Sequence, residues 1–285
     1  MHIQWYPGHM TKTRRMIAEN LKMVDIVAEI VDARIPISSR NPDIDELVGS
    51  KPRLIILNRA DQADPAGNKA WAEYFKSKGF AVLETDANTG KGVAQFSPMI
   101  RSILKDQIAA WAAKGQVGKQ VRAMVVGVPN VGKSTFINKV AKRKSAIAQN
   151  RPGVTRGKQW VTVDAGLELL DTPGILWPKF EDQSIGLNLA YTGAVKDDVM
   201  DIEELACNLM AHLASRYPEA ITARYKIDLP EGAQGWELLE AAGRKRGFLV
   251  SGGEVNFERM SRVLLEEYRS CKLGRFTLEL PEDVR

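Results

Sequence analysis

The chain has 285 residues, 44% of them hydrophobic, which suffices for the core of one large domain or two modest ones. No run of eighteen apolar residues occurs, and the first residues, M-H-I-Q-W-Y-P-G-H-M, lack the charged-then-apolar layout of a signal peptide. We therefore expect a cytoplasmic protein with no membrane partner. Cys207 and Cys271 lack metal-ligand spacing and fall in helical patterns, so we expect buried thiols rather than a disulfide.

The net charge of +5 is unevenly distributed along the chain. Residues 179–285 hold 14 Lys and Arg against 19 Asp and Glu, which leaves 26 against 16 for residues 1–178. Residues 139–158 hold seven basic residues and no acidic one. Such a segment either binds a polyanion, by releasing counterions from a phosphate backbone, or is a solvated loop that binds nothing. Charge alone does not separate these two interpretations.

The hydrophobic pattern of residues 1–178 alternates between strands and helices. In chain order we expect a basic helix at 10–23, strands at 24–34 and 53–58, a helix at 65–78, a strand at 80–85, a helix at 93–113, a strand at 121–127, a helix at 133–142, and strands at 159–165 and 167–171. This order predicts an α/β domain with a mostly parallel sheet. Residues 179–285 instead predict a smaller all-helical domain, with helices near 202–216, 235–245 and 257–271.

The stretch G-V-P-N-V-G-K-S-T, from Gly127 to Thr135, matches the phosphate-binding pattern G-x-x-x-x-G-K-[ST]. An expected strand precedes it and an expected helix follows it, which is the required context. Its glycines let backbone N–H groups surround phosphates, while Lys133 should reach the β and γ oxygens and Ser134 should bind Mg²⁺. The expected phosphate contacts are Asn130, Val131, Gly132, Lys133, Ser134 and Thr135.

The stretch D-T-P-G, Asp171 to Gly174, ends a strand about forty residues later. At this distance from a phosphate loop, we expect Asp171 to hold Mg²⁺ through water and the Gly174 N–H to sense the γ-phosphate. In isolation the four residues would indicate only a turn. Thr155, between the two motifs, is placed to give Mg²⁺ a second hydroxyl, the alternative being a surface threonine after Pro152 and Gly153.

The base-binding signal lies upstream of the phosphate loop. N-R-A-D, Asn58 to Asp61, follows an apolar strand and is similar to the N-K-x-D guanine signature of the translation-factor superclass of GTPases. A carboxylate accepts from the guanine N1–H and 2-amino group, a pair that adenine lacks, and the stem of Arg59 can cover the base. The expected guanine contacts are Asn58, Arg59, Ala60 and Asp61, with Asp86 and Ala87 from T-D-A at the end of the next strand.

The motifs therefore occur in the order guanine signature, base-backing loop, phosphate loop, switch threonine and Mg²⁺ aspartate. This is a rotation of the usual order, which a fold tolerates when its original termini lie close together. With W-Y-P-G-H-M-T-K-T-R-R at the start, V-D-A-R at 31–34, R-P-G-V-T at 151–155, G-F-L-V-S-G-G-E at 247–254 and K-L-G-R-F-T-L-E at 272–279, the chain resembles the ribosome biogenesis GTPase A family of circularly permuted GTPases.

The resemblance spans nearly the whole chain and implies a circularly permuted P-loop GTPase that uses GTP and Mg²⁺. It implies a role in late maturation of the large (50S) ribosomal subunit, with hydrolysis stimulated by the precursor particle. The sequence departs mildly from the family pattern at two places. Arg59 stands where lysine is usual, and residues 85–87 match the family's base-backing loop only loosely.

The resemblance also bears on catalysis. Ile175 stands where many GTPases carry a glutamine that orients water, and an isoleucine has no donor or acceptor. The family pattern offers His9 as the water-positioning residue, whereas a histidine before a helix is otherwise more often a cap or a structural contact. Asn130 occupies a position that accompanies K⁺-dependent hydrolysis in related GTPases, so K⁺ is a further expected cofactor.

Two other interpretations remain beside the GTPase. An RNA-binding scaffold with a structural, slowly hydrolysing guanine-nucleotide site would share the motifs, and an ATPase is opposed only by Asn58 and Asp61. We expect a monomer that contacts ribosomal RNA and proteins but not DNA. The RNA-contact candidates, for each of which surface charge is the alternative, are Lys12, Arg14, Arg15, Lys142, Arg143, Lys144, Arg244, Lys245 and Arg246.

Overall fold

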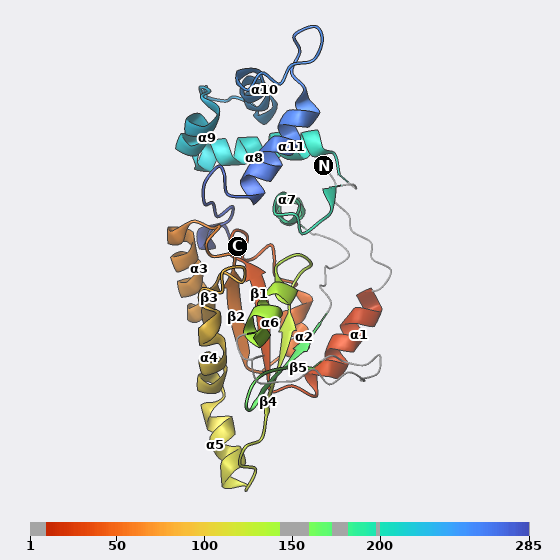
Figure 1. Cartoon of the computed structure of the whole chain (residues 1–285), viewed down its shortest axis with the longest axis vertical. Coiled ribbons are helices and arrows are strands. Elements are labelled where there is room, and N and C mark those ends of the chain that lie inside the picture. Colours follow the sequence, from red (N-terminus) through yellow and green to blue (C-terminus); the bar gives the residue numbers. More distant parts are fainter. Residues whose placement is uncertain (1–9, 143–159, 173–181, 198–199, 285) are drawn as a thin grey trace. The chain divides into compact units, whose positions relative to one another are not determined.

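A computed structural model of the chain describes residues 10–142, 160–172, 182–197 and 200–284 (Figure 1). Its internal contacts divide these residues into two compact units. The α/β unit comprises the described residues between 10 and 172 together with residues 279–284. The helical unit comprises the described residues between 182 and 278.

The α/β unit is built on a six-stranded sheet with the order β3-β2-β1-β4-β6-β5. The strands are β1 (Ile26–Asp32), β2 (Arg53–Asn58), β3 (Ala81–Thr85), β4 (Val121–Val126), β5 (Trp160–Asp164) and β6 (Leu167–Asp171). All neighbouring pairs are parallel except β5 and β6. Every residue of β1 and β2 is buried, which explains why these strands are nearly continuous apolar runs.

Helices cover the sheet because each connection between parallel strands must cross back over it. The helices of this unit are α1 (Met10–Leu21), α2 (Asp43–Val48), α3 (Pro65–Ser77), α4 (Phe96–Ile103), α5 (Lys105–Ala113) and α6 (Lys133–Lys142), with a 3₁₀ turn η1 (Val93–Gln95) before α4. All of them except α5 bury residues against the rest of the unit. Asp64 caps α3 by accepting from the Ala66 N–H, and Pro65 occupies the first turn. The buried rings of Trp71 and Phe75 on α3 pack against Ile55 and Leu57 of β2.

The prediction of a single helix over residues 93–113 is wrong, because the helix is interrupted at Leu104, between α4 and α5. Leu104 lies at the break with φ −95° and ψ 13°, and its side chain is buried. Helix α4 buries Phe96 and Ile100, whereas α5 buries no residue. The apolar stripe that places α4 against the sheet therefore does not continue into α5.

The helical unit contains α7 (Gln183–Tyr191), α8 (Ile202–Arg216), α9 (Pro218–Tyr225), α10 (Gly235–Lys245) and α11 (Phe257–Arg269). The expected helices correspond to α8, α10 and α11, while α7 and α9 were not expected. The unit also has one isolated antiparallel bridge, between Leu249 and Val255. Neither cysteine forms a disulfide in the described part of the chain, as expected, but both are partly exposed, so the expectation of buried thiols is wrong. Cys271 follows α11 with φ 59°.

Residues 279–284, which the sequence assigned to the helical region, lie with the α/β unit. They contain a short 3₁₀ turn, η3 (Pro281–Asp283), that contacts α3. Among the helices that the structure describes, none has both the length and the apolar character needed to cross a membrane.

Candidate nucleotide-binding site

The phosphate-loop motif joins β4 to α6, as its spacing predicts. Gly132 has φ +97°, and a Cβ placed there would lie 2.5 Å from Nδ2 of Asn58. Gly127 has φ +154°, and its Cβ would lie 2.4 Å from the Ile30 carbonyl oxygen. Both positions therefore require glycine, because the loop backbone lies directly against β1 and against the first residue of N-R-A-D.

Lys133 begins α6, and its side chain is buried within the loop. Its Nζ donates to the carbonyl oxygens of Gly127 (3.0 Å) and Val128 (2.6 Å). Burial lowers the pKa of Lys133 to about 8, although the nearby Asp171 carboxylate opposes this shift. Ser134 and Thr135 follow in the first turn of α6 and are exposed, beside the N–H groups that a helix start offers to anions.

Asp171 ends β6 beside the end of β4, where it pairs with Val125 in the sheet. Its Oδ1 atom is buried and has no hydrogen-bond partner among the described residues. Burial raises the pKa of Asp171, and the Lys133 ammonium opposes this shift. The buried carboxylate oxygen of Asp171 interacts electrostatically with Lys133, and the exposed Ser134 is the next residue along the chain. This set of oxygen donors fits Mg²⁺, which prefers oxygen ligands and keeps several waters.

Asn58, at the carboxyl end of β2, holds three segments together through its amide. Its Nδ2 donates to the Val131 carbonyl oxygen of the phosphate loop (2.9 Å). Its Oδ1 accepts from the Thr85 hydroxyl and from the Ala87 N–H, both at 3.1 Å. The sequence had not indicated this role of Thr85; its only signal was a hydroxyl residue at the end of a strand.

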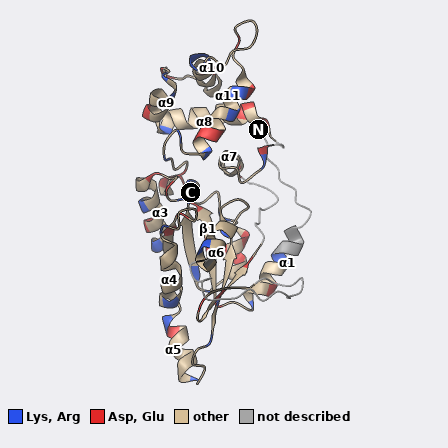
Figure 2. Ribbon diagram, viewed as in Figure 1, with Lys and Arg blue, Asp and Glu red and all other residues tan. Residues whose placement is uncertain are grey.

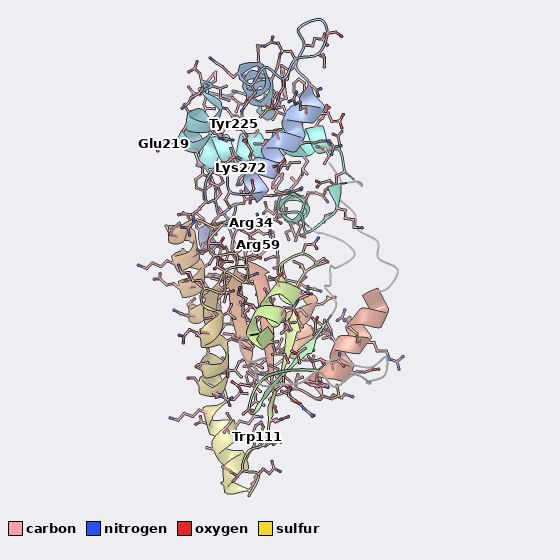
Figure 3. The ribbon with its side chains drawn as sticks, viewed as in Figure 1. Arg34, Arg59, Trp111, Glu219, Tyr225 and Lys272 are labelled. Atoms are coloured by element: carbon pink, nitrogen blue, oxygen red, sulfur yellow. The ribbon has the colours of Figure 1, made fainter. Side chains whose placement is uncertain are left out.

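Arg59 also reaches the phosphate loop, rather than only offering a stem to cover the base. Its Nη2 donates to the Asn130 carbonyl oxygen at 2.7 Å, and its Nη1 lies 3.7 Å from Oδ2 of Asp32. Asp32 in turn accepts from the Arg34 Nε (2.9 Å) and Nη2 (2.8 Å). Figure 3 labels Arg34 and Arg59 near the end of the sheet. Burial would raise the pKa of Asp32, but Arg34 and Arg59 hold that pKa below its ordinary value.

The remaining guanine-contact candidates differ in their surroundings. Asp61 is exposed, and the Ala60 N–H donates to the Thr85 carbonyl oxygen at 3.1 Å. Asp86 is buried, and its carboxylate accepts from the Asn88 N–H (2.8 Å) and from both the N–H and the hydroxyl of Thr89. The contacts of Asp86 are therefore those of a residue that shapes its own turn.

Five of the expected site residues lie outside the described residues: His9, Thr155, Gly174, Arg143 and Lys144. Lys12 lies on α1 and Lys142 is the last residue of α6, and the structure describes only the backbone of these two residues.

The described RNA-contact candidates are largely paired with acids. Arg14 contacts Glu46 at 2.6 Å, and Arg15 contacts Glu19 at 3.1 Å. In the helical unit Arg244 contacts Glu240 at 2.8 Å and Arg246 contacts Glu267 at 3.0 Å. Figure 2 shows Lys and Arg interspersed with Asp and Glu on the helices of both units.

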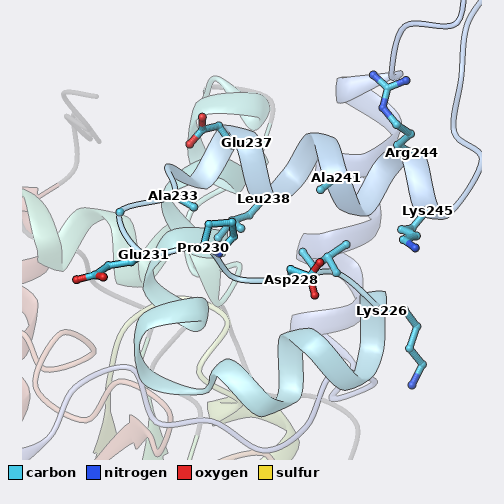
Figure 4. Close-up of a pocket in the computed structure, with 12 residues that line it drawn as sticks. Lys226, Asp228, Pro230, Glu231, Ala233, Glu237, Leu238, Ala241, Arg244 and Lys245 are labelled. Atoms are coloured by element: carbon cyan, nitrogen blue, oxygen red, sulfur yellow. The ribbon is translucent and has the colours of Figure 1, made fainter.

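Lys245 lines a pocket of about 770 Å³ within the helical unit, together with Lys226 and Arg244 (Figure 4). The lining also includes Asp228, Glu231 and Glu237. With three basic and three acidic side chains, this pocket has no single sign of charge that would favour phosphate over another partner.

Comparisons with known proteins agree with the geometry at the ends of β2 and β4. A family model described as "50S ribosome-binding GTPase" matches residues 122–227. The chain is 46% identical to ribosome biogenesis GTPase A of Bacillus cereus, covering 99% of this chain and 95% of that protein. It is 47% identical to the protein of the same name from Priestia megaterium, covering 100% and 99%.

The fold agrees as well. A solved structure described as GDP-bound TM YlqF superimposes with a TM-score of 0.66 at 29% identity, covering 94% of this chain and 100% of that one. The α/β fold with a permuted P-loop domain is thereby confirmed, as is the resemblance that the motifs indicated. The chain belongs to the ribosome biogenesis GTPase A family and is a GTPase that binds guanine nucleotides.

Proposed function

We propose that this GTPase acts in the cytoplasm in late maturation of the large ribosomal subunit, where it binds the precursor particle and is stimulated by it. The observation that carries the proposal is the 46% identity to ribosome biogenesis GTPase A of Bacillus cereus over 284 residues. Identity over this length includes the helical unit as well as the nucleotide site. Ribosomal RNA and proteins are accordingly the proposed partners of a monomeric chain. The proposed GTPase domain is residues 1–178 together with the end of the chain from residue 279, and the proposed ribosome-binding domain is residues 179–278.

The proposed site uses the residues at the ends of β2, β4 and β6. Asp61 is the exposed carboxylate that accepts from guanine N1–H and the 2-amino group, while Asn58 holds the surrounding loops. Lys133 turns from the loop carbonyls to the β and γ phosphate oxygens. Ser134 directly and Asp171 through water would hold Mg²⁺, which would neutralise charge on the transferred phosphoryl group.

The proposed catalytic contribution comes from His9, which would orient the attacking water in place of the missing glutamine. Thr155 would give Mg²⁺ a second hydroxyl, the Gly174 N–H would sense the γ-phosphate, and the Asn130 side chain would hold K⁺. Single-turnover hydrolysis by a His9→Ala variant should lose the particle-stimulated rate while nucleotide affinity stays intact. Near-normal stimulation of that variant would contradict a role of His9 in catalysis.

The K⁺ site is tested separately, by comparing the hydrolysis rates of the wild-type protein in Na⁺ and K⁺ buffers. Equal rates would contradict it.

Guanine selectivity is tested with Asp61→Asn. The substitution exchanges a carboxylate acceptor for an amide, so GDP affinity should fall at least about tenfold and xanthosine diphosphate, with a carbonyl in place of the 2-amino group, should bind better. Fluorescence titration with labelled nucleotides measures both. Asp64→Asn is the matched control, because Asp64 caps α3 nearby and should affect stability alone. Unchanged selectivity of Asp61→Asn would refute the proposed base pocket.

The ribosomal role is tested by hydrolysis rates with and without purified large subunits. A strong rise with large subunits, absent with small subunits, is expected for an assembly GTPase. Tight binding to the particle without any rise would instead favour a scaffold with a structural nucleotide. Cosedimentation under GDP, GTP and a non-hydrolysable analogue then shows which state binds.

A further inference from the structure

The segment of residues 279–284, here called the tail, is fixed to the α/β unit at several points. The Glu279 carboxylate accepts from the N–H of Ile37, the N–H of Ser38 at 2.8 Å and the hydroxyl of Ser38 at 2.5 Å. The Glu279 carbonyl oxygen accepts from Nε1 of the fully buried Trp71 at 2.8 Å. Val284 packs against the same apolar cluster as Trp71. A half-buried carboxylate with three donors is a specific anchor rather than a chance surface contact.

The turn that Glu279 binds is itself attached to the end of β1. Ser39, next to Ser38, is buried, and its Oγ accepts from the Asp32 N–H at 2.9 Å. The Ile35 N–H donates to the Asp32 carbonyl oxygen at 2.9 Å. Both backbone polar groups of Asp32 are therefore held, the N–H by Ser39 of the turn and the carbonyl by Ile35 just before the turn.

From Asp32 the contacts continue to the phosphate loop. The Asp32 carboxylate lies 3.7 Å from the Arg59 guanidinium, which donates to the Asn130 carbonyl oxygen at 2.7 Å. Arg59 and Asn130 both have positive φ, at 60° and 57°, a conformation that non-glycine residues adopt at a cost unless their surroundings hold them. The hydrogen bond between Arg59 and Asn130 thus depends on the neighbouring contacts that hold each backbone in this conformation.

We propose that Glu279 is a positioning residue for the nucleotide site: it fixes the turn at Ile37–Ser39, the turn fixes Asp32, and Asp32 directs Arg59 onto the phosphate loop. This inference rests on the proposed nucleotide site. Coupling through such a series of contacts typically changes a remote affinity by a few-fold to tenfold. Removal of the Glu279 carboxylate should therefore weaken GDP binding without altering any group that contacts the nucleotide.

The test compares GDP affinity of the full chain by fluorescence titration well below its unfolding temperature. Glu279→Ala should weaken GDP binding about three- to tenfold, mostly through faster dissociation. Ser38→Ala, which removes one of the three donors, should give a smaller change in the same direction. Glu282→Ala, on an exposed acid of the same tail, is the matched control and should leave the affinity within about twofold. A lowered unfolding temperature of Glu279→Ala with unchanged GDP affinity would show a merely structural role and overturn the proposal.

A double-mutant cycle tests the route. In an Arg59→Ala background the effect of Glu279→Ala on GDP affinity should shrink to less than about twofold, because the last contact is already lost. An equal effect in both backgrounds would overturn the proposal. Lys133→Ala separates this failure from that of the site itself: if the wild-type chain binds GDP no better than Lys133→Ala does, the proposed nucleotide site is wrong and not only the role of Glu279.

Discussion

At the scale of single residues, Asn58 links the proposed base-binding loops to the phosphate loop. The amide donates to the phosphate loop and accepts from two groups of the loop after β3, so its own polar atoms are engaged inside the protein. Asn58 therefore holds the proposed pocket, and the exposed side chain of Asp61 is the one that we propose contacts the base. These two roles, one structural and one in the proposed base contact, give a reason why N-R-A-D contains both an amide and a carboxylate.

The lowered pKa of Lys133 should make nucleotide binding dependent on pH. Its pKa is lowered to about 8, so in the free protein the ammonium loses its proton as the pH rises through that value. Phosphate oxygens favour the ammonium, and binding above about pH 8 must take up a proton. GDP affinity should thus be constant below about pH 7.5 and fall, by at most about tenfold per pH unit, above about pH 8.

Calorimetric titration in two buffers of different ionisation enthalpy measures this proton uptake directly. Lys133→Arg is the comparison, because a guanidinium stays charged throughout and should remove the dependence between about pH 7 and about pH 8.8. If the GDP affinity of the wild type were the same at both ends of this pH range, with no proton uptake on binding, the lowered pKa of Lys133 would be contradicted.

At the scale of elements, the phosphate loop depends on its closeness to β2. A Cβ on residue 132 would lie 2.5 Å from Asn58 Nδ2 at a φ of +97°, whereas Gly118 has φ +80° and open space around it. Gly118→Ala should cost about 1 kcal/mol through backbone strain alone. Gly132→Ala adds a steric clash and should cost about 2–4 kcal/mol and weaken GDP binding at least about tenfold.

Urea unfolding and GDP titration of the two variants separate the two effects. Similar losses in both would mean that the approach of Asn58 to the loop does not constrain residue 132.

Elements whose signal is local could be predicted from the sequence. Buried parallel strands are apolar runs, and the phosphate loop has a fixed spacing, so β1, β2, β4 and the Gly127–Thr135 motif were expected. The helix break at Leu104 could not be predicted, because neither proline nor glycine marks it. It coincides with the point beyond which the helix no longer packs on the rest of the unit. Contacts of Glu279 with Ile37, 242 residues apart, and of Arg59 with Asp32 depend on which strand ends are neighbours in the sheet, and no local pattern contains that information.

At the scale of the whole molecule, the two units should respond separately to change. In the helical unit the buried Glu267 carboxylate accepts from Arg224, Arg246 (3.0 Å) and the Tyr225 hydroxyl (3.0 Å). Burial would raise the pKa of Glu267, but the hydrogen bonds from Arg224 and Tyr225 and the charge of Arg246 lower it. The carboxylate therefore stabilises this unit above its unfolded pKa, and the contribution is lost as pH falls through the lower folded pKa.

Glu267→Gln should destabilise the helical unit by about 3 kcal/mol, at the low end for a buried pair because both arginines keep access to water. Scanning calorimetry with and without GDP checks this: only the transition that GDP does not raise should move, and its loss of stability in acid should diminish. Glu266→Gln is the control, since that exposed pair with Lys272 contributes at most about 1 kcal/mol. A shift of the GDP-sensitive transition in Glu267→Gln would show that the units unfold together.

The anchoring of Glu279 on the turn after β1 has a consequence for the order in which the protein matures during synthesis. Chains fold as they emerge, N-terminal parts first, so β1, β2 and β3 can pair before the phosphate loop exists. The strand β4 then joins beside β1, while Glu279 is translated only after β1 to β6 and after the helical unit. A nascent chain thus has all the strands of its nucleotide site well before it has the carboxylate that steadies them. Full affinity for nucleotide would then mark a chain whose translation has passed through the helical unit.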